Sequence, residues 1–280
     1  MSLKEDRENN FIEPDAKTLT YDRYLKIDEL LSLQQELSDP KEHDETLFII
    51  IHQVYELWFK QILHEVDRCQ SFFDLDQIQP ALRALKRIDS IQKVLIGQVN
   101  VLETMAPDEF NRFRKHLNPA SGFQSHQFRV LEFRLGLKNK NYFRYYKGEE
   151  KILNKLQAAL DKPSLYDGFL SFLVRRGFNF EAPAVSDFQR PCDERITEVF
   201  SNIYRENLKE YAVYAALESL MDLDEQFTIW RYRHMLMVER MIGNMQGTGG
   251  SMGAKYLATT LEKRLFPEIW ALRNHLGKLS

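Results

Sequence analysis

The chain of 280 residues has little of what several protein classes require. Its two cysteines, Cys69 and Cys192, are too few for a disulfide framework or a Cys-rich metal site. No apolar run approaches the roughly 18 residues of a membrane span, and the charged start MSLKEDRENN lacks the apolar core of a secretory signal. With 38 basic and 41 acidic side chains, the net charge of -3 provides no basic excess for nucleic acid. We therefore expect a cytoplasmic protein that binds neither nucleic acid nor membrane.

Strand-like alternation is also scarce, whereas apolar residues recur every three or four positions through most of the chain. This period predicts an all-α fold, a helical bundle with a cofactor pocket between long helices. The expected helices cover residues 21–38, 44–74, 79–104, 107–117, 122–137, 149–161, 164–176, 193–221, 224–244 and 254–274. We predict a flexible segment at residues 1–18 and a single domain at 19–280, because the linker-like stretch 177–192 still carries aromatic residues.

His52 lies in the apolar segment FIIIHQVYELWFKQ, residues 48–61. Helical spacing places Phe48 and Tyr55 on the same face as His52, with Glu56 and Lys60 paired on another face. A buried imidazole without a partner costs about 1–3 kcal/mol, so it needs a hydrogen bond or a metal. A core histidine bonded to a neighbouring carbonyl is the ordinary explanation for such a residue taken alone.

His234 lies in a second apolar segment, WRYRHMLMVERMIG, residues 230–243, beside Trp230, Met237 and Met241. An axial imidazole, apolar walls and nearby cations are what a haem group requires, and this helix offers all three, although its arginines can equally form a solvated face. No histidine has glutamate three residues before it, and His64 lacks the second histidine of a helical zinc motif. Among metal sites, the spacing therefore favours haem over non-haem iron and zinc.

The stretch GTGGSMG, residues 247–253, matches neither the Walker nor the dinucleotide-binding pattern. It is a flexible linker or a loop that orders over a substrate, with the Thr248 hydroxyl facing a charged group. Arg114, which lies between aromatic positions, is a surface charge or a clamp for a carboxylate.

Four motifs together resemble the tryptophan 2,3-dioxygenase family over residues from about 19 to 270: FIIIHQVYELWFKQ, NPASGFQSHQF, WRYRHMLMVERMIG with GTGGSMG, and FPEIW. The resemblance implies a helical homotetramer that carries haem b. Ferrous iron and O₂ would then cleave the indole C2–C3 bond of L-tryptophan to give N-formylkynurenine, the first step of the kynurenine pathway.

The same resemblance implies roles for single residues. His234 matches the axial iron ligand, and His52 the residue that contacts the indole N–H and orients the ring. Arg114 matches the partner of the substrate carboxylate. The other residues expected to contact the substrate are Phe48, Tyr55, Phe110 and Thr248. Tyr21 and Tyr24 are expected to reach the substrate pocket of a neighbouring subunit. The residues expected to contact the haem are Ala120, Ser121, Gly122, Trp230, Met237 and Met241.

Two positions depart from the family pattern. Phe110 stands where some relatives carry tyrosine, and His126 where an apolar pocket residue is expected. Two other classes of function stay open on the residues alone. A haem sensor or carrier would have no use for Arg114 and Thr248 together, and a cofactor-free interaction protein would be colourless.

Overall fold

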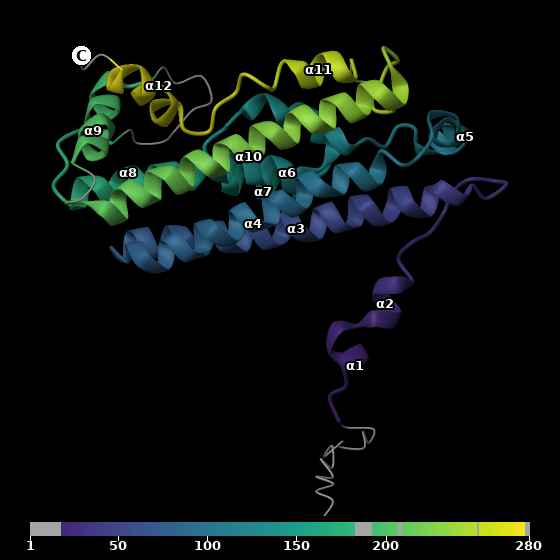
Figure 1. Ribbon diagram of the computed structural model, residues 1–280. Coiled ribbons are helices and arrows are strands. Elements are labelled where there is room, and N and C mark those ends of the chain that lie inside the picture. The colour runs from purple at the N-terminus through teal and green to yellow at the C-terminus, as the bar shows by residue number, and fades with distance from the viewer. Residues whose placement is uncertain (1–17, 183–191, 207–208, 251, 278–280) are drawn as a thin grey trace, which may run out of the picture.

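The computed structural model describes residues 18–182, 192–206, 209–250 and 252–277, and over these residues it is helical without a strand, as predicted. The three long helices are α3 (His43–Asp74), α4 (Ile78–Leu102) and α10 (Tyr211–Ile242), and they run side by side through the bundle (Figure 1). In the part of the chain that is described, no helix is both long and apolar enough to cross a membrane.

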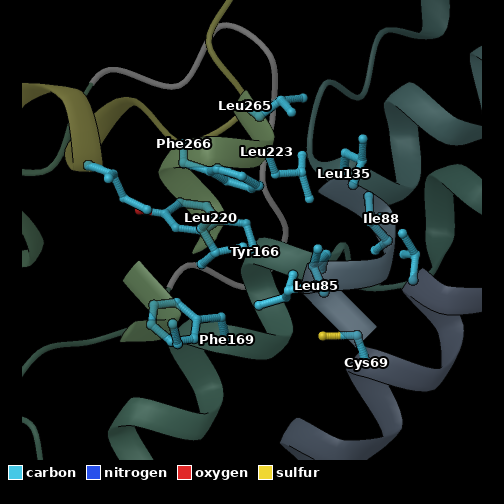
Figure 2. Packing of buried hydrophobic residues seen from close by; sticks show 14 of the residues in the cluster. Cys69, Leu85, Ile88, Leu135, Tyr166, Phe169, Leu220, Leu223, Leu265 and Phe266 are labelled. Carbon is cyan, nitrogen blue, oxygen red and sulfur yellow. The ribbon is translucent and has the colours of Figure 1, made fainter. Parts of the chain in front are cut away.

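Helix α4 lies between the other two long helices. It packs along both α3 and α10, which have little direct backbone contact with each other. Its buried residues recur every three or four positions, as the apolar pattern predicts, and include Ala81, Leu85, Ile88 and Leu95. Figure 2 shows Leu85 and Ile88 in the main core with Cys69 of α3 and with Leu220 and Leu223 of α10. This arrangement holds α3 and α10 apart.

Shorter helices close the bundle. They are α5 (Pro107–Leu117), α6 (His126–Leu135), α7 (Glu150–Asp161), α8 (Leu165–Arg175), α9 (Glu194–Arg205), α11 (Ala254–Ala258) and α12 (Pro267–Leu276), with 3₁₀ turns η1 (Gly122–Gln124) and η2 (Lys140–Tyr146). Local signals set several of their starts. Pro107 opens α5, and the Ser125 hydroxyl accepts the Phe128 backbone N–H at 3.1 Å at the start of α6.

The predicted helix break at residues 222–223 is wrong. The chain stays helical from Tyr211 to Ile242, and the break falls between Arg205 and Tyr211. The acidic residues at 222–225 resemble a helix start, but Asp224 has a tertiary role. Its Oδ2 accepts the backbone N–H groups of Leu265 and Phe266 at 2.9 and 3.1 Å and the Trp270 indole N–H at 2.9 Å.

The single helix expected at 21–38 is also wrong. Two short helices, α1 (Tyr21–Leu25) and α2 (Ile27–Leu31), meet at Lys26, whose φ of 55° ends the first. Neither buries a residue, so packing does not stabilise a longer helix. Both lie away from the bundle (Figure 1). The boundary near residue 18 stays a prediction, because residues 1–17 lie outside the described chain.

Two more predicted helices are interrupted. The helix expected at 122–137 divides into η1 and α6, and the one at 254–274 divides into α11 and α12. Pro267 takes the first position of α12, where its missing N–H costs no hydrogen bond.

Candidate active site

One wall of the site is the middle of α3. The His52 Nδ1 lies 2.7 Å from the Phe48 carbonyl oxygen on the preceding turn. A carbonyl can only accept, so Nδ1 carries the proton and Nε2 of the neutral ring is left as an acceptor. Burial lowers the pKa of His52 below its usual value, which keeps the ring neutral at pH 7. The Phe48 ring lies 4.1 Å from the imidazole, centroid to centroid, and steadies it.

The opposite wall is the C-terminal half of α10. The His234 imidazole stacks on the Trp230 ring with centroids 5.3 Å apart and planes 5° from parallel. Neither of its nitrogens has a hydrogen-bond partner among the residues that the structure describes. Burial, with a smaller effect of His52, lowers the pKa of His234 to about 4. A neutral imidazole with a free lone pair therefore faces the interior.

A cavity of about 270 Å³ lies between these walls. Twelve of the residues singled out from the sequence line it: Phe48, His52, Tyr55, Phe110, Arg114, Ser121, Gly122, Trp230, His234, Met237, Met241 and Thr248. They come from α3, α5, α10 and the loops around residues 121 and 248, far apart in the chain. The Tyr55 hydroxyl donates to the Leu95 carbonyl at 2.9 Å, and burial raises the pKa of Tyr55 to about 12, so it is no proton carrier at pH 7.

Three predicted residues do not line this cavity. Ala120 contributes only its backbone carbonyl, which accepts the Thr248 hydroxyl at 2.6 Å. Tyr21 and Tyr24 are 74% and 70% exposed on α1 and do not reach the cavity of their own chain. His126 does not line it either, so its departure from the family pattern leaves the pocket wall unchanged.

One end of the cavity is charged, and of its residues the sequence had pointed only to the arginines of the His234 helix. Glu132 of α6 accepts from the guanidinium groups of Arg129 and, at 2.8 Å, Arg231 of α10, and all three side chains are buried. Arg231 also donates to the Thr260 and Lys263 carbonyls at 3.3 and 3.2 Å. Two cations sharing one carboxylate leave this end positive, which suits an anionic group on a bound molecule.

Glu56 also faces the cavity, one turn after His52. The predicted pair with Lys60 is wrong: the Glu56 carboxylate accepts from the Ser125 hydroxyl and, at 2.8 Å, from the Gln127 amide. Its position four residues after His52 could have placed it on the same helix face. No comparable signal marks Arg129 or Glu132.

The cavity is also lined by Arg114 and by the loop that follows α10. The Arg114 guanidinium donates to the Gln246 carbonyl and approaches the Met245 sulfur at 3.9 Å. Within the described residues, no cluster of three or more His, Cys, Asp or Glu side chains could hold a metal ion. The lone imidazole of His234 thus fits a metal that brings its other ligands with it.

Comparisons of the sequence with known proteins point to one family. The family model for tryptophan 2,3-dioxygenase matches residues 6–180 and 193–276 of this chain. Proteins of that name from Caulobacter vibrioides and Herpetosiphon aurantiacus are 43% and 46% identical, each over 93% of this chain and 100% of the relative. One from an Anaeromyxobacter species is 46% identical over 93% of this chain and 97% of the relative.

Proposed function

The chain belongs to the tryptophan 2,3-dioxygenase family, and from that premise we propose that it inserts both atoms of O₂ across the indole C2–C3 bond of L-tryptophan. The product is N-formylkynurenine, at the start of the kynurenine pathway. One observation supports this most strongly: two half-buried histidines, one on α3 and one on α10, line the same cavity, one with its proton committed and the other without a partner among the described residues. Such a pair offers an iron ligand and a hydrogen-bond acceptor across the same space.

The donor set fits haem b. The His234 imidazole, which has no partner among the described residues, would hold the iron, and its pKa of about 4 leaves the lone pair available at neutral pH. Trp230, Met237 and Met241 give a flat, polarisable apolar wall, and the Arg129 and Arg231 end suits the carboxylates of the porphyrin. When bound in its ferrous form, this haem supplies the iron at which O₂ is activated.

The chain's own residues orient the substrate. His52 presents Nε2 to the indole N–H, because Nδ1 is occupied by the Phe48 carbonyl. The Phe48 ring packs beside the indole. Because burial lowers the pKa of His52 and disfavours its protonated form, we assign His52 to orientation of the ring and not to removal of a proton.

The amino-acid end of the substrate is placed at the rim. Arg114 pairs with the carboxylate through the guanidinium hydrogens that Gln246 does not use. The Thr248 hydroxyl donates its hydrogen to the Ala120 carbonyl at 2.6 Å, so its oxygen is free to accept from the substrate ammonium group. The carboxylate of the substrate thus meets a hydrogen-bond donor, Arg114, and its ammonium group meets an acceptor, Thr248.

A second copy of the chain completes the site in this proposal. Tyr21 and Tyr24 are exposed on an arm whose two helices bury no residue. Exposed apolar side chains such as Leu30, Leu31 and Leu33 continue along the arm. An apolar arm without a partner in its own chain suits docking on a neighbour, within a homotetramer whose active sites are shared between subunits.

The visible spectrum of the purified protein tests the proposal. We expect a haem Soret band that shifts when L-tryptophan is added to the reduced protein, and N-formylkynurenine after O₂ is admitted. A colourless protein that takes up no added haem would overturn the cofactor assignment. A haem protein that binds L-tryptophan without forming the product would instead be a sensor or carrier.

A further inference from the structure

Two loops meet with unusually little space at the rim of the cavity. One follows α10 and contains Gly249, and the other joins α5 to η1 and contains Ser121. A Cβ atom added to Gly249 would lie 2.6 Å from the Ser121 Cβ and 3.2 Å from its Oγ. Gly249 does not have a positive φ, unlike Gly250 at 77°. The contact with Ser121, and not the turn itself, therefore requires glycine at position 249.

Two hydrogen bonds hold the loop after α10 beside this contact. The Thr248 hydroxyl donates to the Ala120 carbonyl at 2.6 Å, next to Ser121. Arg114 of α5 donates to the Gln246 carbonyl. The side chains placed at the amino-acid end of the substrate are thus the ones that hold this loop.

The contact between these two loops lies between the cavity and a second hollow next to it. Arg114, Gly247 and Thr248 line the inner cavity and also an outer polar hollow. The remaining residues of that hollow are Asn111, Lys115, Asn118, Gln246 and Gly250. The position of segment 246–250 therefore sets where the Thr248 hydroxyl and the Arg114 guanidinium meet a bound molecule.

We propose that Gly249 is a positioning residue for the substrate's ammonium and carboxylate groups, through its contact with Ser121. Unbonded carbon atoms lie about 3.5–4.0 Å apart, so a methyl group at 249 displaces the loop by about 1 Å. A shift of that size lengthens the 2.6 Å Thr248 bond beyond hydrogen-bonding range. The inference rests on the proposed function, because it assumes that L-tryptophan occupies the cavity.

Gly249→Ala tests the contact in the haem-loaded protein. We expect the Kd and KM for L-tryptophan to rise about tenfold, equivalent to about 1.4 kcal/mol, while kcat changes less than threefold. Gly97→Ala is the matched control: Gly97 lies exposed on α4 with nothing within 4 Å of an added Cβ, so both constants should stay within twofold of wild type. A Gly249→Ala protein with unchanged Kd and KM would overturn the proposal.

The rescue variant separates steric contact from general damage. Ser121→Gly removes both atoms that clash with a Cβ at 249. Adding Gly249→Ala to the Ser121→Gly protein should raise KM less than threefold over Ser121→Gly alone. A tenfold rise in that background would mean that Gly249 acts in some other way.

A readout without substrate distinguishes this inference from the proposed function. Amide hydrogen exchange over residues 244–250 should be about tenfold faster in Gly249→Ala, and the faster exchange should disappear in the double variant. If that pattern holds while wild type does not bind L-tryptophan, the loop contact stands and the proposed function fails together with the substrate role of Gly249. If wild type binds L-tryptophan and exchange in Gly249→Ala is unchanged, the loop contact fails and the proposed function survives.

Discussion

Replacing Arg114 with methionine removes a charge from the rim while keeping a long side chain. In the structure Arg114 is half-buried and has one contact that competes with substrate, its bond to the Gln246 carbonyl. The guanidinium can therefore act in two ways: it can bind the carboxylate directly, or it can only hold the loop. Methionine abolishes both actions, so the variant alone does not distinguish them. A second ligand that lacks the carboxylate is needed for the comparison.

Tryptamine, which lacks the carboxylate, supplies the second half of the comparison. A hydrogen bond to a charged group contributes about 1.5–3 kcal/mol, which corresponds to a loss of about 10- to 150-fold in affinity for L-tryptophan. Tryptamine should lose less than about threefold, because it never made that contact. Equilibrium dialysis of both ligands against wild type and Arg114→Met gives the coupling between side chain and carboxylate directly.

Lys115→Met provides the control for net charge. Lys115 follows Arg114, is exposed, and lines only the outer hollow. Its removal should leave both affinities within twofold. Equal weakening of L-tryptophan and tryptamine by Arg114→Met would refute direct carboxylate binding and would leave Arg114 a role in holding the loop alone.

Four further outcomes are expected. His234→Ala should lose stable haem binding, measured by haem titration, and added imidazole should restore the Soret band; full haem content without imidazole would exclude the axial assignment. For His52, N1-methyltryptophan should show a kcat/KM about 2- to 12-fold below that of L-tryptophan, since one neutral hydrogen bond is lost, and equal values would contradict the contact. Burial lowers the pKa of His52 below the usual histidine value of about 6.5. We therefore expect kcat/KM to stay constant as the pH falls through 6.5 and to decline only at lower pH, where Nε2 becomes protonated. A decline of kcat/KM centred above pH 6.5 would count against this. Asp224→Ala leaves two buried donors and one partly buried donor without an acceptor, which costs about 3–5 kcal/mol and lowers Tm by about 5–9 °C in a chain of this length. Replacing the exposed Asp222 with alanine should not lower Tm. A Tm within 1 °C of wild type for Asp224→Ala would show that those bonds contribute little.

The two histidines could be singled out from the sequence because each is a polar exception in an apolar helical face. His52 and His234 stand in segments whose periodicity already predicts a buried stripe. The helix that carries His52 was predicted to within one residue at its start, whereas the one that carries His234 was predicted only for its C-terminal part. Arg114 and Thr248 needed the family resemblance, since a single arginine or threonine near a helix end has no distinctive pattern. In the structure, His52, His234, Arg114 and Thr248 all line the same cavity.

The buried charges could not be predicted in the same way. Arg129, Glu132 and Arg231 each look like surface residues, and the partner that buries Glu132 lies 99 positions away in the chain. Asp224 misled for a related reason: an acidic residue resembles a helix start, yet its carboxylate bonds to residues about 40 positions later. Sequence periodicity reports one helix at a time, whereas these groups depend on which helices meet.

Helix α4 has a consequence for selectivity. It lies between the backbones of α3 and α10, which meet through side chains such as Tyr55 and Trp230, and yet among the cavity-lining residues it contributes only Leu102. Helix α4 is therefore a spacer that contacts both walls of the cavity while leaving almost all of its lining to other elements. Exchanging small for bulky side chains along that spacer would tune which ring systems are admitted, with every contacting residue left intact.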